Sequence, residues 1–86
     1  MMASRKPFLV LVKWHDARFY SATRKRAEIG DFRMALFESV GYLVSQDDAT
    51  TVIASERNEE NEYRDITLIP TGSVVSVRRL APGSLV

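Results

Sequence analysis

The sequence predicts a small, mainly β protein that forms one domain, and three observations support this prediction. Residues 67–80 read TLIPTGSVVSVRRL, in which apolar and polar side chains alternate with the period of two that is typical of strands. Pro70 and Gly72 interrupt this alternation, because proline lacks a ladder donor and glycine tolerates positive φ, so a corner or single 3₁₀ turn is expected. Residues 8–14, FLVLVKW, are rich in the β-branched and aromatic residues that strands favour.

Length and composition place the chain among globular single domains. With 86 residues there is room for one domain, and 45% hydrophobic against 27% charged residues is too apolar for a disordered tail. We expect residues 1–7 and 81–86 to be flexible ends. The apolar run after Arg5 and Lys6 is shorter than a signal-peptide core, so we expect neither secretion nor a membrane span. The absence of cysteine excludes disulfides and suits a reducing, cytoplasmic location.

Charge is distributed unevenly along the chain. Residues 1–26 carry seven cations against one acid, Asp16, for a net charge of +6, and residues 27–86 carry five cations against ten acids, for −5. Such polarity can steer a partner or bring copies of the chain together head to tail. The alternative is two solvated surfaces with no binding role.

The segment after the first strand, residues 15–37, leaves two structures open. Ser21 or Thr23 is a candidate cap for a short helix over residues 23–29, which Gly30 would end. The alternative is a long polar loop.

The rest of the chain predicts four more strands. A second strand at about residues 38–45 is favoured because one parity is mostly apolar there: Met34, Leu36, Val40, Tyr42 and Val44. A turn at residues 46–49 joins this strand to a third strand. The charged run ERNEENE at residues 56–62 predicts a solvated loop before the last two strands. The third, fourth and fifth strands are expected at residues 50–55, 63–69 and 74–80.

Five short strands with one long first connection are typical of a small, partly open barrel of the SH3 or Sm type. The first strand, however, is apolar on both faces, and so is the second. A small barrel has one interior, so residues 15–37 or a second copy must cover the surplus, and the sequence predicts a homo-oligomer. Trp14 is expected in the core and becomes a partner contact only if it is exposed. The interface candidates are Leu9, Leu11, Trp14 and Leu43.

Several segments resemble a group of small uncharacterised proteins found in bacteriophages and bacterial genomes. They are VKWHDA at residues 12–17, SVGYLV at residues 39–44, and Ile69-Pro70 with VVSVRRL at residues 74–80. The resemblance covers most of the chain and is weakest in residues 18–37. It implies a compact phage-type or bacterial accessory protein, and it brings no known activity.

A more remote resemblance is to the Sm-like RNA-binding proteins. Gly41-Tyr42-Leu43, with Asp47 ahead of Val52, is similar to their central hairpin, and residues 69–77 are similar to their closing strand pair. This resemblance implies a barrel and a ring-like assembly. The sequence departs from the Sm-like pattern at residues 70–72, where that pattern has an arginine, and it starts with a strand where those proteins start with a helix.

The basic run Arg24-Lys25-Arg26 makes RNA or single-stranded DNA a candidate ligand. Arg18, Phe19 and Tyr20 lie nearby, so the segment mixes cations that neutralise phosphates with rings on which bases stack. The alternative is a solvated helix or loop whose aromatic side chains turn into the core. The binding candidates are Arg18, Tyr20, Arg24, Lys25 and Arg26.

Catalytic and metal-binding patterns are sparse. His15 and Asp16 invite an acid–base interpretation, but neighbours on a strand point to opposite faces and cannot readily pair. One histidine and no cysteine leave transition metals without ligands, and the acids of residues 59–65 lack the spacing of a calcium loop. We therefore expect that the protein is not an enzyme and that it binds neither a cofactor nor a metal ion. The leading hypothesis is an interaction module that self-associates and binds another protein, and the alternative is a single-stranded nucleic-acid binder.

Overall fold

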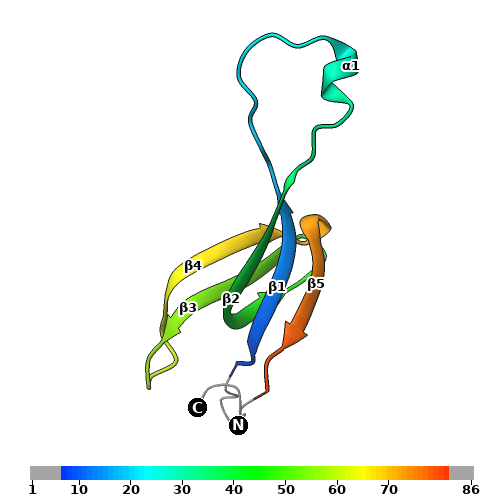
Figure 1. Ribbon diagram of the computed structural model, residues 1–86. Coiled ribbons are helices and arrows are strands. Elements are labelled where there is room, and N and C mark those ends of the chain that lie inside the picture. Colours follow the sequence, from blue (N-terminus) through cyan, green and yellow to red (C-terminus); the bar gives the residue numbers. More distant parts are fainter. Residues whose placement is uncertain (1–6, 82–86) are drawn as a thin grey trace.

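The computed structural model describes residues 7–81 and has five antiparallel strands in one open sheet (Figure 1). The order across the sheet is β4-β3-β2-β1-β5, so the last strand pairs with the first. The mainly β prediction is confirmed, and the expected number of strands is correct. In chain order the elements are β1 (Leu9–Asp16), α1 (Arg26–Ile29), β2 (Ala35–Gln46), β3 (Thr50–Arg57), β4 (Tyr63–Pro70), the 3₁₀ helix η1 (Thr71–Ser73) and β5 (Val74–Arg79).

The core lies on one face of the sheet, which we call the inner face. It is a cluster of four buried side chains from β1, β3 and β4, with four half-buried neighbours packed against it. Because alternate residues of a strand point to opposite faces, β1 contributes every second side chain to this cluster. The four buried residues are Val10, Val12, Ile53 and Ile69, and the four neighbours are Trp14, Leu43, Val74 and Val77.

The corner predicted around Pro70 and Gly72 is η1, and it explains why the sheet curls. η1 joins β4 to β5, which form the two opposite edges of the sheet. In a flat sheet four strand spacings would separate these edges by roughly 19 Å, whereas three residues of 3₁₀ helix rise only about 6 Å. The sheet must therefore bend until its edges approach at this corner. No ladder joins β4 to β5 among the residues described, so the sheet remains open.

Thr71 links this corner to the turn between β2 and β3 through hydrogen bonds. Its backbone N–H donates to the Ala49 carbonyl at 3.1 Å, and its Oγ1 donates to the Asp47 carbonyl at 2.7 Å. The same Oγ1 lies 3.0 Å from Oγ1 of Thr51, the one buried polar side chain in the described residues, which also accepts from Gln46 Nε2 at 3.0 Å. The hydroxyl of Thr51 is thus satisfied inside the core, as a buried polar group requires.

Gly41 marks a close approach of two strands. A Cβ at this buried position would lie 2.8 Å from the Ala54 carbonyl oxygen and 3.3 Å from Ile53 Cβ. Glycine is therefore required here because the β3 backbone passes too close for a side chain.

Several predicted boundaries were wrong. β2 begins at Ala35, earlier than expected, and β3 continues to Arg57, so part of the charged run is strand and only the rest is a turn. The helix has four residues, and its N-cap is Lys25 with no side-chain cap, so neither Ser21 nor Thr23 caps it. The segment between β1 and β2 is therefore mostly irregular with a single helical turn. Apart from Pro7 and Ala81, the predicted flexible ends lie outside the described residues.

Candidate functional site

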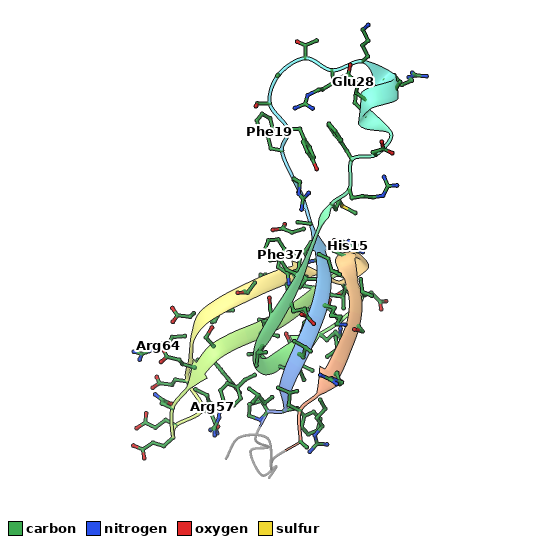
Figure 2. All side chains as sticks on the ribbon, in the orientation of Figure 1. His15, Phe19, Glu28, Phe37, Arg57 and Arg64 are labelled. Carbon is green, nitrogen blue, oxygen red and sulfur yellow. The ribbon has the colours of Figure 1, made fainter. Side chains whose placement is uncertain are left out.

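Residues 17–34 form an arm between β1 and β2 that carries α1 and projects away from the sheet (Figures 1 and 2). We call this segment the basic arm, because it has five cations against two acids and a net charge of +3. All five predicted nucleic-acid-binding residues lie in it. The cations are Arg18, Arg24, Lys25, Arg26 and Arg33, and the acids are Glu28 and Asp31.

Aromatic stacking ties the two sides of the arm together. The rings of Tyr20 and Phe32 are stacked, with centroids 3.9 Å apart and planes inclined by 18°. Arg24 places its guanidinium 5.3 Å from the centre of the Phe32 ring, and Arg18 Nη1 donates to the Tyr20 hydroxyl at 3.1 Å. Such ring and cation contacts stabilise a segment that has little secondary structure of its own.

This packing changes the roles that we assign to two aromatic residues. Tyr20 is half-buried, with one ring face against Phe32, whereas Phe19 is 89% exposed and lies on the arm away from the sheet (Figure 2). Phe19, which the list of candidate residues left out, is therefore the freer ring for stacking. The sequence indicates that only one of the two rings can pack inward, since neighbours in an extended chain point in opposite directions, but it does not show which one.

The second candidate surface is the face of the sheet opposite the core, on β1 and β2. Register pairs place Leu9 opposite Tyr42, Leu11 opposite Val40, Lys13 opposite Glu38 and His15 opposite Leu36. We call these eight residues the outer face. Leu9 and Leu11, two of the predicted interface residues, lie on it and are half-buried.

The other two interface candidates lie on the inner face. Trp14 packs against the core cluster, its Nε1 donates to Ser39 Oγ at 3.0 Å, and its ring lies 5.7 Å from that of Phe37. Leu43 packs against the same cluster. The four candidates thus divide between the two faces of the sheet. Leu9 and Leu11 lie on the outer face, where a partner can reach them, whereas Trp14 and Leu43 lie on the inner face.

The one histidine lies at the end of β1, near the base of the arm (Figure 2). His15 and Asp16 are consecutive in the strand and so point to opposite faces, and Asp16 Oδ1 accepts from the Ala17 N–H at 2.8 Å instead. His15 Nδ1 is buried and has no hydrogen-bond partner in the described part of the chain. The arrangement does not form an acid–base pair.

The acidic β3–β4 hairpin is organised by its own contacts. Asn58 Oδ1 accepts the backbone N–H groups of Glu60 and Glu62, at 3.0 and 2.9 Å. Arg64 donates to Glu56 across the hairpin, and this contact lowers the pKa of the Glu56 carboxyl below its usual range. Within residues 7–81 no group of three or more histidine, cysteine or acidic side chains is placed to hold a metal ion.

Comparison with known proteins gives no match from which a role for either candidate surface could be inferred. The chain matches no protein-family model, no curated protein and no solved structure. In the described part of the chain, no helix has both the length and the apolar character needed to cross a membrane.

Proposed function

We propose that this chain is a non-enzymatic interaction module that self-associates through the outer face of β1 and β2. The main support for this proposal is the exposure of large apolar side chains on that face: Leu36 is 58% exposed and Val40 is 54% exposed. Leu11 stands opposite Val40 and Leu9 opposite Tyr42 across the β1–β2 ladder, whereas the Lys13–Glu38 pair separates Leu36 from this group. Contiguous exposed apolar surface is uncommon on monomers and marks sites of association.

The charges of the outer face favour a second copy as the occupant. Lys13 and Glu38 lie opposite each other, between the Leu11–Val40 and His15–Leu36 pairs, with Nζ and Oε2 3.8 Å apart. Both side chains are about half exposed, so their charges are available to a partner. A two-fold axis through this face would place Lys13 of each copy against Glu38 of the other, which is the self-complementarity that an isologous interface requires.

The wider relationships of the chain are part of the same proposal. The strand order, with a three-residue corner between the two edge strands, supports a barrel of the SH3 or Sm type. The sequence resemblance supports a phage-type or bacterial accessory protein, and the absence of cysteine supports a cytoplasmic location. A further protein partner of such a module would bind a surface that the self-association leaves free.

Sedimentation velocity over a range of protein concentrations tests the proposal. The wild-type chain should show a mass above that of a monomer, which falls on dilution. Val40→Asp places a carboxylate in the apolar interface and should weaken association at least tenfold, because a buried unpaired charge is costly. The matched control is Ile29→Asp, since Ile29 is 48% exposed but lies in α1 on the basic arm, away from the outer face.

The two possible failures have distinct meanings. A wild-type chain that remains monomeric at high concentration would overturn self-association altogether. Equal weakening by Val40→Asp and Ile29→Asp would instead show that copies meet, but not through the outer face.

A further inference from the structure

The basic arm holds charge that the fold leaves unneutralised. The described residues contain two ion pairs, Lys13 with Glu38 and Glu56 with Arg64, and both lie in the sheet. Outside the arm the described residues carry five cations against nine acids, a net charge of −4, whereas the arm carries +3. The charge separation of the sequence is therefore also a separation in space, and an anionic partner is attracted to the arm and repelled by the sheet.

The cations of the arm differ in how free they are. Arg33 donates to the carbonyls of Gly30 and Phe32, and Arg24 packs over Phe32, so these two hold the arm in shape. Lys25 and Arg26 lie at the start of α1, are exposed, and make no ion pair with any other residue of the described range 7–81. They are the charges most available to a ligand.

Phe19 supplies the second half of the chemistry. Its ring is the most exposed large apolar side chain in the described residues, beside Arg18 and next to the Tyr20–Phe32 stack that orders the arm. A protein partner is usually bound through a contiguous apolar centre with a polar rim, whereas the arm offers a freely exposed aromatic ring among dispersed cations. That combination matches an unstacked base and its phosphates.

We propose that the basic arm binds single-stranded nucleic acid, with Lys25, Arg26 and Arg18 neutralising phosphates and Phe19 stacking on a base. The proposal goes beyond self-association and does not depend on it, since every residue involved belongs to one arm. Tyr20 is a positioning residue here, because its stack with Phe32 fixes the segment that presents Phe19.

Fluorescence anisotropy with labelled oligo-uridylate and oligo-thymidylate of about 12 nucleotides tests the proposal, over a salt series. Affinity should fall as salt rises, with a log–log slope of about −2 for three neutralised phosphates on a single strand. Lys25→Glu with Arg26→Glu should weaken binding at least tenfold and flatten the slope. Phe19→Ala should weaken binding at least about fivefold with the slope unchanged, because it removes stacking and no charge.

The control with matched charge is Arg78→Glu with Arg79→Glu, two exposed cations of β5 that should affect affinity much less than the arm pair. All substituted side chains are exposed, and circular dichroism establishes that each variant is folded. Val40→Asp should keep its oligonucleotide binding, which separates this proposal from the previous one.

Five results would overturn the proposal. They are no binding at low salt, an affinity that salt does not change, equal losses from the arm and β5 pairs, preference for polyglutamate over either oligonucleotide, and tighter binding of duplex than of single strand. The last of these would contradict the stacking role of Phe19. Comparison with oligo-deoxyuridylate, which differs from oligo-uridylate only in lacking the 2′-hydroxyl, shows whether that hydroxyl contributes.

Discussion

Substitution of Gly41 by alanine adds a methyl group where the β3 backbone passes close to β2. The new Cβ would lie 2.8 Å from the Ala54 carbonyl oxygen, closer than van der Waals contact allows. That oxygen belongs to a backbone that is paired with β2 on one side and β4 on the other, so it cannot move aside without disturbing both ladders. The methyl group must therefore strain the centre of the sheet.

The expected loss follows from two opposing effects. Overpacking of a well-packed interior costs about 1–3 kcal/mol. Replacing glycine by alanine recovers about 0.4–1 kcal/mol, because the unfolded chain loses conformational freedom. We expect a net destabilisation of about 1–2 kcal/mol, which lowers the melting temperature of a domain this size by about 4–16 °C.

Urea unfolding monitored by circular dichroism measures this loss, at one protein concentration because self-association adds to apparent stability. Gly72→Ala is the matched control, since no atom lies within 4 Å of its added Cβ and its φ is not positive. This control should be as stable as the wild type or slightly more stable. If Gly41→Ala unfolds at the same urea concentration as Gly72→Ala, the β3 backbone does not pass Gly41 as closely as described.

Two further predictions concern the turn before β3 and an irregularity in β4. Asp47 Oδ1 accepts the N–H groups of Thr50 and Ala49, at 2.7 and 2.8 Å, and these bonds lower the pKa of the carboxyl below its ordinary value of 3.8. The ionised form therefore stabilises the fold above pH 3.8, and this stabilisation is lost as the pH falls further. In urea unfolding, the difference in stability between the wild type and Asp47→Asn should therefore become smaller below that pH. A difference that does not change with pH would contradict the role of the charge. Asp65 has a φ of 57°, in the left-handed region that β-branched residues avoid. In thermal unfolding, Asp65→Val should therefore be at least about 1 kcal/mol less stable than Asp65→Gly. Equal stability of the two variants would exclude the left-handed conformation.

Local sequence patterns predicted most of the strands and the corner, because both depend on neighbouring residues. Alternation identified the strands, and Pro70 with Gly72 identified the join that is η1. The same local rule placed His15 and Asp16 on opposite faces. The clustering of the candidate nucleic-acid-binding residues was also predictable, since they are close in the chain and the arm keeps them close in space.

The features that escaped prediction depend on contacts between distant residues. The shape of the arm depends on the stack of Tyr20 on Phe32, twelve positions away, and only that stack shows that Phe19 is the free ring. The outer face depends on the β1–β2 register, which brings Leu11 opposite Val40 and leaves the latter exposed. The sequence supplies the side chains of both surfaces, but the partner of each strand and the close approach of β3 to Gly41 are properties of the whole sheet.

The most direct test of the central claim, that copies meet through the outer face, uses the absence of native cysteine. A cysteine at Val40 lies near the proposed two-fold axis, where a disulfide can form between copies whose Cα atoms approach within about 7 Å. Under mild oxidation at micromolar concentration, Val40→Cys should convert to a covalent dimer much faster than Ile29→Cys, which has a similar exposure but lies on the basic arm. Equal and slow cross-linking of the two variants would contradict the claim.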